Sequence, residues 1–329
     1  MHLTAAMVKK AAREAGADDV GICKVETLET FPPNPQAPQV PSRTSTKFKS
    51  AVVLLVRMAV GEFRAKNKLC IMHVSQMALR RMDRAANRLI RFLERQGYPA
   101  LQTAAQETAW DLKGGSYGLL STRHVAVEAG LGNLGLEMNL LHPRFGPRCD
   151  VTVVLTDADL EADQRMTETL CIGESCGRCL LACPPDAVLH WNLDKRRCAT
   201  YAQPLGISGL FRYFREALRA ETPQKSWEYL SAPAFYDKWK SLHWQIGAFA
   251  SCPRCIEVCP VGDDYLPHLA DRHRTIEEKT DDKVVKLKLY RDARKHNEPI
   301  PGLDPWRLRW IGEEGYKPKK KEKATSREA

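Results

Sequence analysis

Eight cysteines of the chain fall into two short runs and one isolated position. The first run has gaps of four, two and three residues before a proline: Cys171, Cys176, Cys179, Cys183, Pro184. The second run has gaps of two and three and also ends on proline: Cys252, Cys255, Cys259, Pro260. Cys198 stands alone between them in "DKRRCATY". Eight thiolates are the number that two cubane [4Fe–4S] clusters require, with four for each cluster.

The spacing also predicts how the ligands are shared. Successive cysteines of a run lie on one compact loop, whereas the cysteine before proline lies far enough along to reach the other cluster. The predicted ligands of cluster one are Cys171, Cys176, Cys179 and Cys259. Those of cluster two are Cys198, Cys252, Cys255 and Cys183. The four-residue gap after Cys171 departs most from the usual spacing, and Gly173 is placed to let the extra residues loop out.

Two structural Zn(Cys)₄ sites are the alternative, since they also use eight thiols. Zinc sites usually show paired C-x2-C elements, whereas both runs here continue with x3-Cys-Pro, which favours iron–sulfur clusters. Three further cysteines, Cys23, Cys70 and Cys149, remain outside this set and are predicted to be buried, inert thiols.

Composition limits the class of protein. The chain has 329 residues, 43% hydrophobic and 27% charged, which is typical of a soluble globular protein. No apolar run reaches the roughly 18 residues of a membrane span, and the longest, 50–60, contains Arg57. The first 16 residues have helical spacing rather than an export signal, so a cytoplasmic location is expected. Eleven cysteines there favour metal or redox chemistry over disulfides.

The formal charge of +10 at first favours a polyanion partner. The tail 317–329 holds six basic and two acidic residues and so supplies +4 of that charge. Two clusters bound by thiolates would remove roughly four more, which leaves about +2. A solvated tail is therefore the preferred interpretation of the charge run.

The elements that must position these cysteines can be predicted from periodicity. Helices are expected at 5–15, 75–96 and 124–130, and strands at 19–25, 51–56 and 150–156. Five prolines make 31–42 an extended connector. Because no regular βαβ repeat occurs, an α+β sandwich is predicted over 1–160. A cysteine-rich module at 161–265 and a C-terminal extension at 266–329 with a disordered basic tail complete the predicted domains.

The segment "GLGNLG" (130–135) matches the G-x-G-x-x-G dinucleotide fingerprint letter by letter. It follows a helical pattern instead of a strand, and no acidic residue ends a second strand about 20 positions later. We therefore reject a dinucleotide site. Gly130, Gly132 and Gly135 are instead expected to let the backbone approach a flat ligand closely.

Several stretches together resemble the epoxyqueuosine reductase and reductive dehalogenase superfamily. These are "AVEAGLGNLGLEMNLLHPRFGPRCDVTVVLTDADL" (126–160), the first cysteine run, "LDKRRCATY" and "GAFASCPRCIEVCPVG". The resemblance implies a nitroreductase-like α+β sandwich that binds cobalamin or another corrinoid, followed by a bacterial-ferredoxin-like module with two [4Fe–4S] clusters. Within the superfamily, "LLHPRFGPR" and "GNLGLE" resemble the dehalogenase branch. The aspartate-proline segment of the epoxyqueuosine branch has no counterpart in "AAQETAWDLKGGSYGLLSTRH".

The resemblance implies a reductase that passes electrons through the clusters to the corrinoid for reductive cleavage of a substrate. Tyr117, Arg123 and His124 lie just before the glycine-rich segment and are the candidate catalytic residues, with Tyr117 equally explained as a loop tyrosine. A ferredoxin or flavodoxin is the expected electron donor, and a small-molecule substrate is preferred to tRNA. The alternatives are tRNA modification of the epoxyqueuosine type, and an electron carrier without a substrate.

Overall fold

The computed structural model describes residues 3–30, 39–65, 68–103, 109, 111–112, 117–203, 207–243, 252–269 and 275–296. Its centre is a four-stranded sheet in the order β1-β2-β6-β3, in which every neighbouring pair is antiparallel. The strands are β1 (Asp19–Lys24), β2 (Ser50–Arg57), β3 (Ala100–Thr103) and β6 (Cys149–Thr156). Three of them confirm predicted strands. The prediction missed the edge strand β3. It has only four residues, too few for an alternating pattern to be recognised in the sequence.

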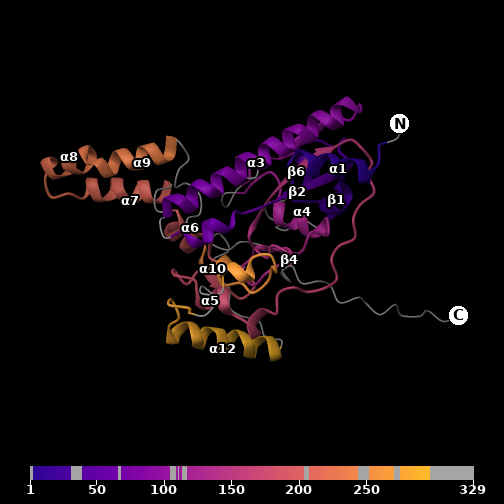
Figure 1. Ribbon diagram of the computed structural model, residues 1–329. Helices are drawn as coiled ribbons and strands as arrows, with labels where there is room; N and C mark the ends of the chain where they lie inside the picture. The colour runs from indigo at the N-terminus through magenta and orange to yellow at the C-terminus, as the bar shows by residue number, and fades with distance from the viewer. Residues whose placement is uncertain are drawn as a thin grey trace.

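Both faces of this sheet are covered, which explains why β2 is an unbroken apolar run instead of an alternating one. On one face the sheet packs against α1 (Ala5–Ala15) and α3 (Lys68–Arg95) (Figure 1). This core is made of side chains with almost no exposed surface: Val8, Ala12, Ile22, Val52, Leu54, Ala86, Leu89, Leu93 and Val154. The opposite face packs against α4 (Thr122–Glu128) and joins the core beneath the cysteines.

The long helix α3 begins at Lys68, seven residues before the predicted start, and has 28 residues. Its inner face holds Met82, Leu89 and Leu93, all fully buried, at helical spacing. The helix ends as predicted before Gly97, whose φ of +85° turns the chain and lets Tyr98 N donate to Leu93 O at 3.0 Å. The N-terminal part of α3 reaches past the sheet toward the cysteines (Figure 1).

The "GLGNLG" segment forms an antiparallel hairpin of β4 (Asn133–Leu134) and β5 (Leu140–Leu141) directly after α4. Gly132 shows why glycine is needed there, since a Cβ at this position would lie 1.9 Å from Leu141 O. The element directly before the motif is the helix α4, and the next element after it is the strand β5. This agrees with the rejection of a dinucleotide site.

The cysteine region is made of short elements linked by turns. In chain order they are η3 (Gly173–Ser175), α5 (Arg178–Leu181), β7 (Val188–Leu189), β8 (Asn192–Leu193), α6 (Lys195–Ala202) and α10 (Arg254–Glu257). The smaller elements of the first region are α2 (Val25–Thr30), η1 (Pro41–Arg43) and η2 (Val60–Arg64). Most of the proline-rich connector, 31–38, lies outside the described residues, as does the basic tail 317–329.

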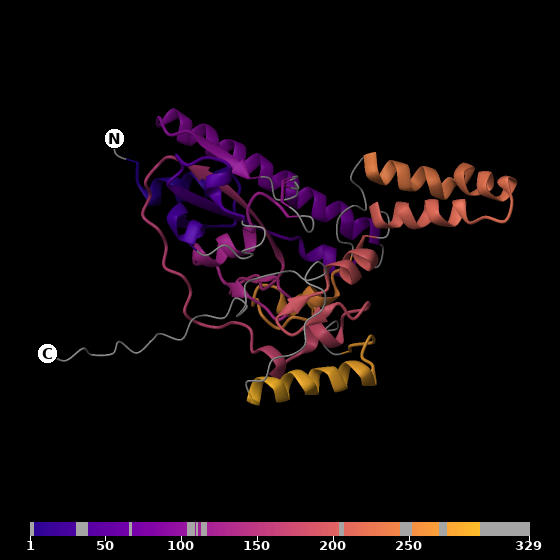
Figure 2. The same ribbon diagram turned by 180° about the vertical axis from the view of Figure 1, so that it is seen from behind.

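Three helices between Cys198 and Cys252 form an arm that extends from the body (Figures 1 and 2). They are α7 (Ile207–Leu218), α8 (Pro223–Ser231) and α9 (Pro233–His243). Tyr213 lies at the centre of the arm, with its ring 6.0 Å from that of Tyr229 and 6.1 Å from that of Phe235. The sequence analysis treated this stretch as part of the cysteine module and did not foresee a separate helical unit.

A last helix, α12 (Asp281–His296), lies across the cysteine loops at the end of the molecule opposite α3 (Figure 1). Leu287 of this helix packs directly against the backbone at Gly177, where a Cβ would come within 2.5 Å of it. Among the described residues, no helix is long and apolar enough to cross a membrane.

Candidate functional site

The first cysteine run is bent into shape by two glycines with positive φ. The extra residues of the wide first gap form the 3-10 turn η3, which begins at Gly173 with φ +64°. Gly177, with φ +60°, then starts α5, which carries Cys179. The turn therefore accommodates the four-residue gap by tightening the chain between Cys171 and Cys176.

The second run and the isolated cysteine are positioned by two other short helices. Cys255 lies on α10 and Cys259 follows it. Cys198 lies on α6, whose N-terminus is capped by the buried side chain of Asp194, with Oδ1 accepting from Arg196 N at 3.1 Å and Arg197 N at 3.0 Å. The cap fixes where α6 begins and thereby orients the isolated thiol.

The eight thiols lie close enough to influence one another electrostatically, in two groups. Burial, together with neighbouring Cys183 and Cys252, raises the pKa of Cys198 to about 12. Burial likewise raises the pKa of Cys179 well above its usual value, with contributions from Glu137, Cys255, Cys171 and Cys259. The thiols around Cys179 include three of the four predicted for cluster one and are called the first group. Those around Cys198 are predicted for cluster two and are called the second group, and Cys255 is close to both.

Such a group of buried thiols cannot ionise without a nearby positive charge, because each thiolate would repel the others in a poorly solvated place. Metal ions supply that charge. Backbone amides already point at two of the sulfurs, from Gly173 N to Cys171 Sγ at 3.4 Å and from Ala187 N to Cys183 Sγ at 3.1 Å. The donor set therefore fits iron–sulfur clusters, whose sulfurs accept such hydrogen bonds.

The described residues contain no group of three or more His, Cys, Asp or Glu side chains arranged to hold a single metal ion. In a cubane each thiolate binds a different iron, so its four sulfurs are spread around the cluster instead of meeting at one ion. Ligation of the eight cysteines stays a prediction.

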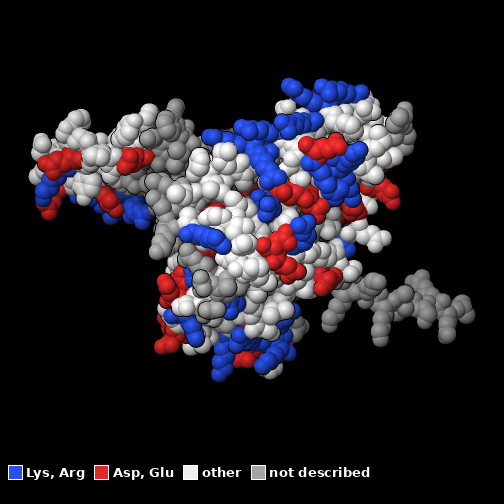
Figure 3. Space-filling view, in the orientation of Figure 1, with Lys and Arg blue, Asp and Glu red and all other residues white. Residues whose placement is uncertain are grey.

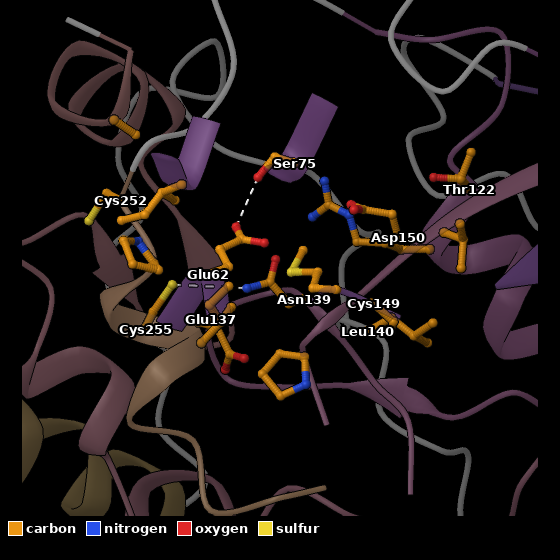
Figure 4. A pocket seen from close by; sticks show the side chains of 18 of the residues that line it. Glu62, Ser75, Thr122, Glu137, Asn139, Leu140, Cys149, Asp150, Cys252 and Cys255 are labelled. Carbon is orange, nitrogen blue, oxygen red and sulfur yellow. Dashed lines mark hydrogen bonds between the residues drawn. The ribbon is translucent and has the colours of Figure 1, made fainter. Parts of the chain in front are cut away.

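A cavity of about 370 Å³ lies between the sheet and the second group of thiols (Figure 4). Its walls come from the inner side of α3, from the β5 hairpin, from the start of β6 and from α6 and α10. The apolar part of the lining includes Met58, Ile71, Leu79, Met82, Leu140, Val151, Leu193 and Ile256. Three predicted ligands of cluster two line it as well: Cys198, Cys252 and Cys255. The size is within the usual range for small-molecule sites.

Three acidic side chains and one basic side chain are the charged groups that line this cavity. Burial raises the pKa of Glu62 to about 7, although Ser75 Oγ donates to Glu62 Oε1 at 2.9 Å. Burial also raises the pKa of Asp150 to about 6, and nearby Arg123 acts in the opposite direction. Both carboxyl groups can therefore exchange a proton near neutral pH.

A third carboxyl group, Glu137, lies between the cavity and the cysteines. It is 3% exposed, and burial raises its pKa to about 7. Within the described part of the chain, Glu137 Oε1 and Glu62 Oε2 are buried oxygens without a hydrogen-bond partner. Both residues line the cavity, so a ligand with N–H or O–H donors would satisfy them.

The structure separates the three predicted catalytic residues. Arg123 lines the cavity, and its guanidinium donates to Met138 O at 2.7 Å. His124 is buried behind it against Ser121, and burial together with Arg123 lowers its pKa to about 3, so it is neutral at pH 7. Tyr117 does not belong to the cavity lining, and the ammonium of Lys195 lies 4.4 Å from the centre of its ring. Their catalytic roles stay predictions.

The three glycines of the predicted corrinoid floor have close neighbours within the chain. A Cβ at Gly130 would lie 2.4 Å from Gln164 O, and one at Gly135 would lie 2.6 Å from Glu137 Oε2. Gly132 is needed for the β4–β5 hairpin itself, where a Cβ would meet Leu141 O. The part of 130–146 that does line the cavity is Glu137, Asn139 and Leu140.

The remaining cysteines have different surroundings. Cys23 is buried as predicted, and burial raises its pKa to about 12, which keeps the thiol protonated. The prediction was wrong for Cys70, which is exposed on α3. Cys149 lines the cavity. The sequence analysis also missed Glu62, because nothing in "VGEFR" marks a glutamate that α3 will bury, and it noted Asp150 only as the start of a strand.

No family model matches the sequence. The chain is 31% identical to an epoxyqueuosine reductase of Synechococcus sp. (strain RCC307) over 191 residues, which are 58% of this chain and 47% of that protein. It is 30% identical to a tetrachloroethene reductive dehalogenase of Dehalobacter restrictus over 100 residues, 23% of this chain and 18% of that protein. The chain thus spans less than half the length of these relatives. A crystal structure of a selenomethionine-labelled epoxyqueuosine reductase covers 85% of this chain and 69% of its own, with 16% identity and a TM-score of 0.48.

Proposed function

We propose that this chain, a relative of the epoxyqueuosine reductases and the reductive dehalogenases, is an iron–sulfur oxidoreductase that reduces a substrate in the cavity beside its second group of thiols. The observation that carries the proposal is that Cys198, Cys252 and Cys255 line the same cavity as Glu62, Arg123 and Asp150. Electrons would thus arrive where titratable side chains are available. The matches do not favour the dehalogenase branch over the epoxyqueuosine branch, and that preference stays a prediction.

A corrinoid is the cofactor that the sequence resemblance implies, and the cavity of about 370 Å³ would hold only part of it. The buried oxygens of Glu62 and Glu137 without partners would accept from the amide side chains of a corrin ring, and Leu140 and Met82 would contact its apolar edge. When bound, the reduced cobalt supplies the strongly reducing centre, which no side chain can provide.

The chain's own residues would then bind the substrate and move its proton. Arg123 is held by the carbonyl of Met138 and carries the positive charge that stabilises a developing anion. Asp150, with its pKa raised to about 6, and Glu62, with its pKa raised to about 7, are the carboxyl groups able to donate a proton near neutral pH. The apolar wall from α3 excludes water from this reaction.

Anaerobic purification followed by iron and sulfide analysis tests the proposal. About eight iron and eight sulfide per chain are expected after reconstitution. Cob(II)alamin added to the reconstituted protein should change its EPR spectrum. Stoichiometric zinc with negligible iron, in protein made anaerobically with iron supplied, would reject the redox function. An unchanged spectrum of free cob(II)alamin with excess protein would leave a two-cluster electron carrier as the function.

One observation favours tRNA modification as a second candidate. Five arginines follow one exposed ridge of α3 at steps of four, four, three and four residues: Arg80, Arg84, Arg88, Arg91 and Arg95. The ridge is the row of basic side chains along the upper edge in Figure 3. A four-residue step on a helix is about 6 Å, and arginine is well suited to phosphate groups.

Binding of a tRNA stem-loop measured at several salt concentrations distinguishes this candidate. A phosphate-binding ridge predicts an affinity that falls steeply with salt and that Arg84→Glu with Arg91→Glu weakens. No binding of the stem-loop at low salt would favour a small-molecule substrate, as the sequence analysis expected.

A further inference from the structure

Helix α12 covers the loop that carries the first group of thiols. Lys283 Nζ donates to Leu181 O at 3.4 Å, and Arg291 Nε donates to Glu174 O at 2.7 Å. A second nitrogen of Arg291 reaches Ser175 O at 3.3 Å, immediately before Cys176. The helix therefore lies directly over the segment predicted to hold cluster one.

A buried carboxylate fixes the helix in this position. Glu174 is 2% exposed and accepts from Trp191 Nε1 at 2.6 Å and from Arg294 at 3.0 Å, and it also pairs with His190. Burial alone would raise the pKa of Glu174, but these partners lower it to about 2, so it stays ionised. Because Arg294 belongs to α12, the ion pair joins the helix to the cysteine loop.

The outer face of α12 combines cations with exposed apolar side chains. Lys288 and Lys295 are exposed on this face, and Arg291 lies between them with its guanidinium on the cysteine loop. Beside them, Val285 is 68% exposed and Leu289 is 56% exposed. Acidic residues are present at the N-terminus of the helix, Asp281 and Asp282, and at Asp292 within it. Lys and Arg nevertheless predominate at the lower end of the molecule in Figure 3.

This face is on the side of the cysteine region that does not border the cavity. None of Cys171, Cys176, Cys179 and Cys259 is among the cavity lining, whereas three thiols of the other group are. Ile172, which directly follows Cys171 in the chain, has an apolar side chain that is 66% exposed. Electron transfer slows steeply with distance. Electrons that reach the cavity through both clusters would therefore enter the chain at cluster one, on the α12 side.

We propose that the outer face of α12, together with Ile172, is the docking surface for an acidic, low-potential one-electron donor of the flavodoxin or ferredoxin class. The inference rests on the proposed function, since it requires a cluster at the first group of thiols. Cluster one, held by Cys171, Cys176, Cys179 and Cys259, would when bound accept the single electron that the donor's reduced flavin or cluster gives up, and no proton or group crosses the interface. The apolar residues form the centre of the contact, and the cations steer the acidic partner.

Such an interface is expected to be small and short-lived, as is usual for electron-transfer encounters, which bury less than about 1,200 Å². Its association rate should fall with salt, because exposed charges are screened over roughly 10 Å at 0.1 M ionic strength. A basic surface that bound nucleic acid would share this salt dependence but would not accelerate electron transfer from a protein donor.

The test uses reconstituted protein and an acidic bacterial flavodoxin in its fully reduced form. In the variant Lys288→Glu, Lys295→Glu, stopped-flow bleaching of the clusters by flavodoxin should slow by roughly tenfold at low salt. Bleaching by dithionite, which needs no docking surface, should be unchanged. The difference between variant and parent should largely disappear near 1 M salt, where charges are screened over about 3 Å.

The matched control is Arg212→Glu, Arg219→Glu on the arm, which changes the net charge equally at two other exposed arginines. Equal slowing in both variants would overturn the docking surface and indicate steering by net charge alone. No slowing in either variant would overturn it as well and indicate that electrons enter elsewhere. Calorimetric titration of flavodoxin into the chain before reconstitution gives a second measurement. Weakened binding in the α12 variant alone supports the surface even if the clusters, and with them the proposed function, fail.

Discussion

The two groups of thiols have similar spacings but different surroundings. The group of Cys183, Cys198, Cys252 and Cys255 borders a cavity that α3 and the sheet enclose. Glu62 and Glu137 in its lining each have one buried oxygen without a hydrogen-bond partner. The group of Cys171, Cys176, Cys179 and Cys259 lies under α12, where the buried carboxylate of Glu174 is fully paired. Under the proposed function, this difference would place the exchange of electrons on the α12 side and the reduction of substrate on the cavity side.

Two buried glutamates show the same difference between the cavity side and the α12 side. Glu62 and Glu174 are each 2% exposed, yet the pKa of Glu62 is raised to about 7 and that of Glu174 is lowered to about 2. Burial acts on both in the same sense, so the difference comes from partners. Glu62 has one hydroxyl, whereas Glu174 has an indole, an imidazole and a guanidinium.

The largest expected effect is on iron content. Cys198→Ser should remove cluster two and about half of the iron, because Cys198 is predicted to supply one of the four thiolates that this cluster needs. Iron and sulfide analysis after anaerobic reconstitution measures this. Cys23→Ser, a buried thiol far from both groups, is the control and should retain all the iron. Equal iron loss in both variants would show that the ligand set is misassigned.

The next effect is on stability and has opposite signs at the two glutamates. The folded pKa of Glu62 lies above its unfolded value of 4.5, so its stabilising contribution is present below pH 4.5 and is lost as pH rises through about 7. Glu62→Gln should therefore gain stability relative to the parent between pH 5 and 8, by on the order of 3 kcal/mol. Urea unfolding at a series of pH values measures the difference.

Glu174→Gln is the comparison for this measurement. Its pKa is lowered, so its contribution is present above pH 4.5 and is lost only as pH falls toward 2. The variant should be less stable than the parent by a constant amount between pH 5 and 8. Parallel pH curves for the two variants would mean that the two carboxyl groups do not differ as described.

A smaller effect isolates the packing of α12 on the cysteine loop. Gly177→Ala places a methyl group 2.5 Å from Leu287 and also strains a residue with φ +60°. Gly97→Ala has the strain alone, since φ is +85° and nothing lies within 4 Å. Gly177→Ala should therefore be less stable than Gly97→Ala by about 1–3 kcal/mol in urea unfolding. Adding Leu287→Ala should remove part of that difference, and no recovery would argue against the contact.

The smallest expected effect is on the reduction potential of one cluster. It tests whether the cluster bound by Cys255 lies on the cavity side. Asn139 Nδ2 lies 4.0 Å from Cys255 Sγ, so its amide weakly favours the more negative, reduced cluster. Asn139→Leu should lower the midpoint potential of one cluster slightly and leave the other unchanged in an EPR-monitored redox titration. A shift of both clusters together would indicate a general change in folding.

Much of the local structure was predictable because it depends on neighbouring residues. Helix α1 begins and ends at the predicted residues, since Thr4 caps it and Gly16 ends it. Strands β1, β2 and β6 follow apolar runs long enough to recognise. The start of α3 was placed too late, because its first turns carry "KLCIMHV", whose apolar residues are too dense to show a single face.

The arm and the roles of individual carboxyl groups could not be predicted in this way. Helices α7–α9 cover each other around Tyr213, and nothing in their sequence shows that the unit leaves the body. Glu62 becomes a group with a pKa near neutrality only because α3, which follows it in the chain, closes over it. The sequence held no sign of this, since burial depends on contacts between distant segments.

The sequence by itself determined the number and order of the candidate thiol ligands, since the two cysteine runs and the prolines that follow them are local and need no fold to be recognised. It also determined the strands and helices whose periodicity is local. Only the tertiary structure decided which thiols face the cavity and which lie under α12, because that depends on how loops more than about 50 residues apart in the chain pack together. The same packing decided the protonation of each buried carboxyl group, since a pKa follows from the solvent removed and the partners supplied by other segments.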